Sequence, residues 1–262
     1  QKLLRQALNA AGHNEQAEKS VHFSYEMVAL SHSTAAHLGY GDSASTNRPF
    51  VEVSGRKGLG VKADDLLDLL TKAAAHEVRA RNKELTDTEV HEIATAIGIA
   101  AVRYFMIKYS RGKVIAFDID EALSFEGESG PYLQYAAVRA GNILRKLKAK
   151  DDIDSAYIIE QLPSLSLSSL EDPDGTDLWG LVLEASRLEE VAEQAIRTLE
   201  LSSLAKYAFT LAQSFNGFYH RYPVLKESDV DVRLWRAAVV VYVRNQLSKA
   251  LELMGCEVPT RM

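Results

Sequence analysis

The sequence predicts a mainly α-helical fold, in which a helical bundle is preceded by a small α/β part. The first observation is a low content of turn-forming residues, because 15 glycines and 6 prolines among 262 residues are about 8%, against about 12% in average usage. The second is the spacing of apolar residues, which recur with a helical period from residue 64 onwards. Long regular helices explain both observations.

The first 62 residues are of mixed character. Residues 1–11 resemble the middle of an amphipathic helix, whereas 22–28 are too short and too aromatic for a helix and are expected to be extended. Glycine, serine and asparagine make 39–49 a predicted loop. Residues 50–53 alternate as a short strand, and 54–60 form a basic loop with three glycines.

Helical periodicity then marks two successive helices. Thr86 and Glu89 have the spacing of a capping box, so the second helix is predicted to begin there. Residues 114–118 are expected to be a brief extended connector. Pro131 fits the first turn of a third helix, because that turn leaves its amides unbonded, and this helix is predicted to run to about Ala149.

The rest of the chain predicts a long loop and three more helices. Residues 151–175 are rich in serine and aspartate and are expected to be a loop within the bundle. Helices are predicted over 176–199, 203–221 and 229–254, the last of them ended by Gly255. Their apolar spacing is typical of a bundle.

Composition excludes several classes of protein. A single cysteine, Cys256, rules out a disulfide framework and a multi-cysteine zinc site, and it indicates a reducing, cytoplasmic setting. The formal charge of −6 argues against bulk electrostatic coating of nucleic acid. No apolar run approaches the roughly 18 residues of a membrane span, so no membrane partner is expected. The seven histidines lack metal-ligand spacing, so no metal site is expected.

The helix predicted from Pro131 has an aromatic and basic face. The segment 129–150 holds five basic residues and no acidic one. Tyrosines can stack on unpaired bases while arginine and lysine neutralise phosphates; alternatively, the tyrosines lie half-buried at the core edge and the cations favour a helix C-terminus. Within an arc of about 80 degrees lie Tyr132, Tyr135, Arg139, Asn142 and Lys146.

The loop at 54–60 is a second candidate site. Its glycines would let backbone amides approach a phosphate, and its cations would supply charge; a plain solvated turn is the alternative. It matches neither a Walker P-loop nor a dinucleotide fingerprint. The residues concerned are Ser54, Gly55, Arg56, Lys57 and Gly58.

Two further basic and aromatic clusters lie on the last two predicted helices or just after them. Each alone would be a solvated face, but with the helix from Pro131 they would make three such surfaces in one helical half. Trp179 and Trp235 are expected in the core. The clusters are Arg233, Arg236, Arg244 and Lys249, and Tyr207, Tyr219, His220, Arg221 and Tyr222.

Four segments, in chain order, carry a likeness to a known family. They are EVSGRKGLGVKADDLLD (52–68), AFDIDEALSFEGESGPYLQYAAVRA (116–140), LAQSFNGFYHRYPVL (211–225) and LELMGCEVPTRM (251–262). In order and spacing they resemble the C-terminal half of the arginyl-tRNA synthetases, which are class I aminoacyl-tRNA synthetases. The resemblance implies a remnant of a Rossmann-type catalytic domain over 1–62, a helical connecting region that contacts the tRNA stem over 63–127, and a helical anticodon-binding domain of the DALR type over 128–262.

The resemblance also implies a reaction. Enzymes of this family use ATP and Mg²⁺ to attach L-arginine to its tRNA through an arginyl-adenylate. Their His-x-Gly-His signature is absent here, so we expect a C-terminal fragment that binds no ATP and forms no arginyl-tRNA alone. Their KMSKS loop corresponds to 52–56, where Glu52 and Gly55 replace both signature lysines; Arg56 or Lys57 is left as the cation for ATP phosphates.

By motif, some residues correspond to positions that approach the anticodon loop in relatives. The resemblance therefore implies tRNA for arginine as the partner, with Met262 alternatively a plug for the last helical turn. The rival hypothesis is a helical protein-interaction module without RNA binding. The corresponding residues are Tyr132, Tyr135, Arg139, Tyr219 and Met262.

Overall fold

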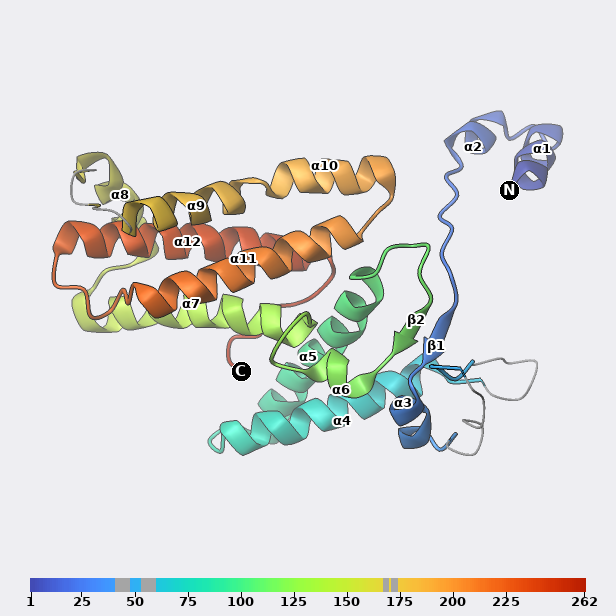
Figure 1. Ribbon diagram of the computed structural model, residues 1–262, viewed down its shortest axis with the longest axis horizontal. Helices are drawn as coiled ribbons and strands as arrows, with labels where there is room; N and C mark the ends of the chain where they lie inside the picture. The colour runs from blue at the N-terminus through green and yellow to red at the C-terminus, as the bar shows by residue number, and fades with distance from the viewer. Residues whose placement is uncertain (41–47, 53–59, 167–169, 171–173) are drawn as a thin grey trace.

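The computed structural model describes residues 1–40, 48–52, 60–166, 170 and 174–262 (Figure 1). The described part is mainly helical with one small sheet, which confirms the predicted fold class. The predicted loop at 54–58 lies outside the described residues.

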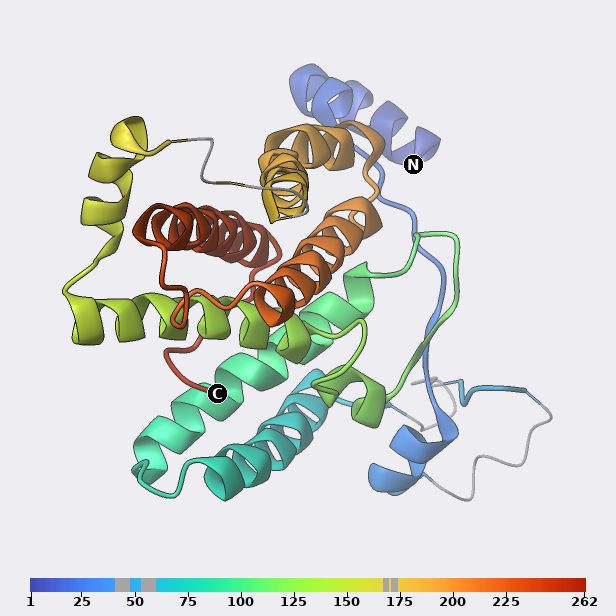
Figure 2. The ribbon, with the colours of Figure 1, turned by 60° about the vertical axis from the view of Figure 1, so that its left-hand side comes forward.

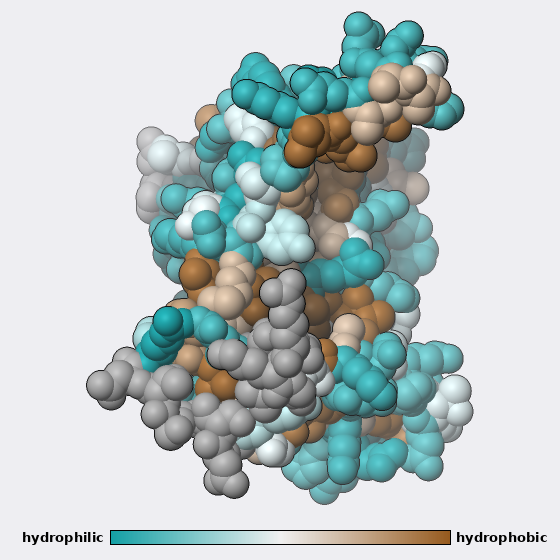
Figure 3. Space-filling model, turned by 90° about the vertical axis from the view of Figure 1, so that its right-hand side faces the viewer, coloured by the Kyte–Doolittle hydropathy of each residue, from teal (hydrophilic) through white to brown (hydrophobic). Residues whose placement is uncertain are grey.

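The N-terminal part holds short elements. Helices α1 (Lys2–Ala10) and α2 (Asn14–Lys19) pack on each other and stand away from the rest of the molecule on an extended segment (Figure 1). Strand β1 (Val28–Leu30) precedes α3 (His32–His37) and pairs in parallel with β2 (Ile115–Phe117). Figure 3 views this side of the molecule and shows apolar side chains reaching the surface below the α1–α2 pair.

The expected strand over residues 50–53 is wrong as an element. Val51 makes one isolated antiparallel bridge to Leu30, and residue 53 lies outside the described part. The extended segment at 114–118 is confirmed, because it contains β2, and the helix at the start of the chain is confirmed as α1.

Two long helices, α4 (Ala63–Arg81) and α5 (Asp87–Ile107), form an antiparallel hairpin. The capping box is confirmed, since Glu89 N–H donates to Thr86 Oγ1 while the Glu89 carboxylate accepts from Thr86 N–H. By length and hydropathy α5 alone among the described helices resembles a membrane span, but 56% of that window is buried inside the protein, as in a core helix.

The C-terminal bundle begins at α7. The chain enters it through the short helix α6 (Ile119–Leu123). In Figures 1 and 2, α7 lies along α11 and α12 and its first turns contact α5. The helices are α7 (Gly130–Asp151), α8 (Ser155–Gln161), the 3-10 turn η3 (Leu162–Ser164), α9 (Asp174–Ser186), α10 (Leu188–Thr198), α11 (Ser202–Arg221) and α12 (Val230–Leu253).

Two expectations for the bundle are wrong. The region 151–175 is not one long loop, because Asp154 caps α8 by accepting from Tyr157 N–H at 2.9 Å. The helix expected over 176–199 is two helices. The amide of Arg187 bonds back to Glu184 at 3.3 Å, a three-residue step that interrupts the regular helix.

Candidate functional site

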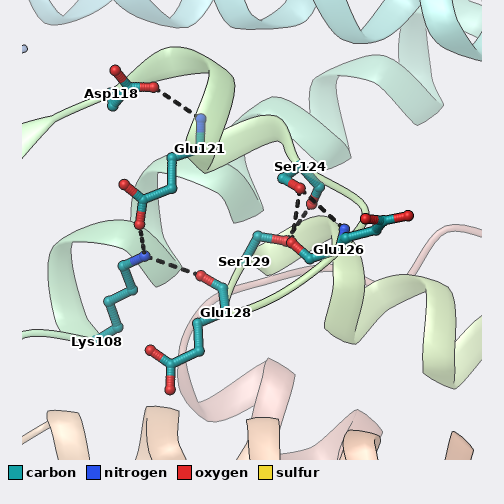
Figure 4. A network of polar contacts seen from close by, with 7 residues as sticks. All are labelled: Lys108, Asp118, Glu121, Ser124, Glu126, Glu128 and Ser129. Atoms are coloured by element: carbon teal, nitrogen blue, oxygen red, sulfur yellow. Dashed lines mark hydrogen bonds and ion pairs between the residues drawn. The ribbon is translucent and has the colours of Figure 1, made fainter.

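The first turn of α7 is held by a cap and a loop. Tyr132 N–H donates to Ser129 Oγ at 3.2 Å, and the same hydroxyl donates to the carbonyl of Ser124 (Figure 4). Because the cap satisfies an amide that the helix leaves open, the loop before α7 sets where this helix begins. It therefore sets the position of Tyr132.

A buried lysine ties that loop to α5 and α6. The Nζ of Lys108 lies 2.6 Å from Glu121 Oε1 and 3.1 Å from the carbonyl oxygen of Glu128, and its side chain is 6% exposed (Figure 4). The same ammonium lies 4.5 Å from the centre of the Phe105 ring. These contacts anchor the residues just before α7.

The start of α7 also lies unusually close to α5. A β-carbon at Gly130 would lie 2.3 Å from the carbonyl oxygen of Ala100, so only glycine allows this approach. One turn later the buried side chain of Gln134 donates to the carbonyls of Ala96 (3.1 Å) and Glu257 (2.6 Å). The glycine and the glutamine of the GPYLQY segment thus fix α7 against α5 and the C-terminal segment.

Two of the five residues predicted on one face of α7 bond to a residue of α11, and a third bonds to one of these two. Asn216 Nδ2 donates to Tyr132 Oη at 3.0 Å, and Asn216 Oδ1 accepts from Arg139 Nη1 at 2.8 Å. Arg139 Nη2 in turn donates to Tyr135 Oη at 3.0 Å, with its guanidinium carbon 4.7 Å from the centre of that ring. We call Tyr132, Tyr135, Arg139 and Asn216 the tyrosine network; all four are half-buried.

The rings of this region rest on the bundle core. Tyr132 lies 5.6 Å from Phe209 between ring centres, and Tyr219 stacks on Phe215 at 6.4 Å. Tyr132 and Tyr219 are only partly buried, so each keeps some surface in solvent. The rings are thus held in place while part of each remains available to a ligand.

The other predicted contact residues are distributed differently. Lys146 is exposed, and half-buried Asn142 accepts from the Arg145 guanidinium. Met262 is half-buried against the apolar cluster between α4 and α5, away from the core on which Tyr132 and Tyr219 pack. Its apolar contacts are therefore with a helix pair that precedes the bundle.

Sequence reasoning missed Asn216, although its side chain bonds both Tyr132 and Arg139 and so joins α11 to α7. The available signal was its position three residues before Tyr219, because residues three apart lie on one helix face. A helical wheel treats one helix at a time, so it could not pair α11 with α7.

The predicted surface on α12 is wrong for two of its arginines. Arg233 Nη1 lies 3.4 Å from Asp151 Oδ2, and Arg236 is 9% exposed with its Nη1 2.7 Å from Glu227 Oε2. Each guanidinium therefore has a carboxylate counterion, which a phosphate would have to displace.

The cluster at the end of α11 is also partly internal. Tyr207 is buried and donates to the carbonyl of Ala185 at 2.8 Å, and burial raises the pKa of its hydroxyl above the usual range. Arg221 pairs with Asp177. The tryptophan prediction fails for Trp179, which is 45% exposed, whereas Trp235 is half-buried and donates to a backbone carbonyl.

The described residues contain no cluster of metal ligands, and they do not include the predicted phosphate loop. In this part of the chain no group of three or more histidine, cysteine, aspartate or glutamate side chains could hold a metal ion. The predicted phosphate loop at 54–58 falls in one of the gaps.

The sequence and the fold of this chain resemble those of known proteins. Residues 133–262 match the model of the DALR anticodon binding domain. The whole chain is 33% identical to the arginine–tRNA ligase of Deinococcus radiodurans and 34% identical to that of Thermococcus kodakarensis. The chain belongs to the arginyl-tRNA synthetase family. The solved Thermus thermophilus arginyl-tRNA synthetase superposes with a TM-score of 0.72 at 30% identity over 99% of this chain.

The likeness covers only part of those synthetases. The chain spans 40% of the Deinococcus sequence, 37% of the Thermococcus sequence and 38% of the Thermus chain. Within this arginyl-tRNA synthetase segment, Tyr135, Arg139 and Asn216 lie in the matched anticodon-binding domain, and Tyr132 directly precedes it.

Proposed function

We propose that the chain binds the anticodon stem-loop of arginine tRNA through the tyrosine network together with Asn142, Lys146 and Tyr219. The observation that carries the proposal is that three members of the network lie on α7, where the matched anticodon-binding domain begins, and that its arginine bonds to a tyrosine of the same helix and to Asn216. Met262 would contribute from the side of α4 and α5.

The chemistry of the network suits unpaired RNA. Aromatic rings stacked on bases contribute roughly 1–3 kcal/mol for each base. Arg139 donates to an amide oxygen and a phenol oxygen, both neutral, so the guanidinium keeps its full charge for a phosphate. Held rings and an uncompensated cation together favour a loop whose bases are turned outwards.

For the intact protein we propose arginine–tRNA ligase activity in the cytoplasm, with ATP and Mg²⁺ as cofactors. The support is the named activity of the relatives that match the whole chain. We further propose the division into 1–62, 63–127 and 128–262, with Ser54, Gly55, Arg56, Lys57 and Gly58 as the phosphate loop; the matched family model supports the last of these parts.

Replacing Tyr135 by alanine tests the RNA interface. We expect Tyr135→Ala to weaken binding of an arginine-tRNA anticodon hairpin about tenfold or more, because a stacking platform is lost. Thermal unfolding should change little, since the ring is half-buried at the core edge. The exposed Tyr157 on α8 is the matched control, and Tyr157→Ala should leave the affinity unchanged.

A collapse of the unfolding midpoint in Tyr135→Ala would show that this ring belongs to the core and contradict the interface. A protein-interaction module would bind the hairpin weakly and without preference between loop and duplex. The proposed RNA interface should prefer unpaired bases, and its affinity should fall steeply as salt rises.

A further inference from the structure

A hollow of about 400 Å³ lies between α7, α12, the start of α8 and residues 258–260. Arg145 and Lys148 of α7 and Arg244 of α12 line it, and we call these three residues the basic groove. Ser155 and Thr260 also line the hollow. The groove thus joins cations from two helices to neutral hydrogen-bonding groups.

The cations of the basic groove differ in whether they have a carboxylate partner. Among the described residues Asp154 is the sole acidic one lining it, and its Oδ2 lies 3.1 Å from Lys148 Nζ, which also reaches Asp152 Oδ1 at 2.7 Å. The hydrogen bonds to Asp152 and Asp154 raise the pKa of Lys148. The carboxylates of Asp152 and Asp154 are therefore both paired with Lys148.

The two arginines keep their charge available. Arg145 Nη2 donates to the carbonyl of Thr260 at 3.2 Å and to the amide oxygen of Asn142, both neutral acceptors. Across the ranges that the structure describes, Arg244 makes no ion pair or side-chain hydrogen bond, and it is exposed. A β-carbon on Gly141 would lie 3.4 Å from Arg244 Nε, so this guanidinium lies over α7.

The position of the basic groove relates it to the tyrosine network. Gly141 at its floor is about 200 degrees around α7 from Arg139, so the groove opens on another side of the helix. Arg145 lies about 15 Å along the axis from Tyr135, and it donates to Asn142, which comes between Arg139 and Arg145 on the same helix. A strand leaving the tyrosine network past Asn142 reaches the groove.

We propose that the basic groove binds backbone phosphates of the same RNA, next to the anticodon loop on the tyrosine network. The inference rests on the proposed function and adds a sequence-independent clamp to it. Guanidinium groups without carboxylate partners bind phosphate oxygens through parallel N–H donors, and such contacts fix orientation without reading bases.

The test compares Arg244→Gln with Lys249→Gln, an equal loss of charge at an exposed position of the same helix outside the groove. The full chain is titrated with the anticodon hairpin over a range of salt concentrations. We expect Arg244→Gln to weaken binding about threefold to tenfold, equally for matched and altered loop sequences. It should also lower the slope of log affinity on log salt by about 0.7 to 0.9. Lys249→Gln should change neither.

The outcomes separate the two proposals. If the hairpin fails to bind the unaltered chain, the proposed function falls. If it binds and Tyr135→Ala weakens it while Arg244→Gln behaves as Lys249→Gln, only the groove proposal falls. The groove proposal falls as well if Arg244→Gln abolishes binding of inorganic phosphate alone, or of an acidic polyglutamate peptide, while leaving the hairpin affinity unchanged.

Discussion

The arginines of α7 and those in the first half of α12 have different kinds of partner. Arg139 and Arg145 donate to amide, phenol and backbone oxygens, all of them neutral. Arg233 and Arg236 lie against the carboxylates of Asp151 and Glu227. Helices of similar basic content therefore offer different amounts of uncompensated charge.

The difference shows that the number of cations on a helix does not determine how well that helix binds phosphate. A guanidinium bonded to a neutral acceptor stays fixed in direction yet carries its full charge, whereas one paired with a carboxylate must give up that pair before it binds another anion. We therefore expect α7 to act in binding and the first half of α12 to act in stability.

The largest effect expected from this comparison is on unfolding. Arg236→Met should lower the free energy of unfolding by about 2–3 kcal/mol, because it leaves Glu227 without its counterion in a largely buried place. Arg139→Met should cost less than about 1 kcal/mol, yet weaken hairpin binding about tenfold. Urea unfolding and hairpin titration measure both quantities; equal stability losses would break the comparison.

A second substitution gives Arg139 a carboxylate partner, like those of Arg233 and Arg236. Asn216→Asp places a carboxylate where Arg139 now meets an amide oxygen, so it should hold or slightly raise stability while weakening RNA binding about fivefold to tenfold through neutralised charge. Asn216→Ala is the control, since it removes both hydrogen bonds of the Asn216 side chain without adding charge. Stronger RNA binding in Asn216→Asp would contradict the role of Arg139.

Local signals predicted much of the fold. The capping box at Thr86, the proline at position 131 and the terminating glycine at 255, with φ of +69°, each mark a helix end that the structure confirms. Helix α8 was missed because a serine-rich stretch obscured the cap at Asp154. Composition averages over a window, whereas a cap depends on one side chain.

The site was predictable only within one helix. The wheel brought Tyr132, Tyr135 and Arg139 together correctly, since their relative placement follows from helical geometry alone. It could not supply Asn216, which is 77 residues from Arg139. For the same reason the sequence placed Arg236 in a basic surface cluster, because the loop containing Glu227 meets Arg236 only in the folded chain.

The smallest expected effect is the dependence of the α12 pair on pH. Although burial opposes it, a hydrogen bond from the Asp229 amide and the nearby Arg236 lower the pKa of Glu227. A carboxyl group with a lowered folded pKa stabilises the protein above its unfolded pKa, near 4.5, and this contribution is lost as pH falls through the folded value.

Glu227→Gln should therefore flatten the stability profile below about pH 5 by at most about 1 kcal/mol, as measured by urea unfolding at pH 7 and at about pH 3.5. The tyrosine network has no carboxylate, so Asn216→Ala should leave the pH dependence of stability unchanged. Asn216→Asp adds a carboxylate beside Arg139, so its stability should fall more at acid pH. If the pH dependence of stability in Asn216→Asp matches that of the unaltered chain, Arg139 does not pair with the new carboxylate. The charge that Arg139 presents would then depend on solvent rather than on the acceptor beside it.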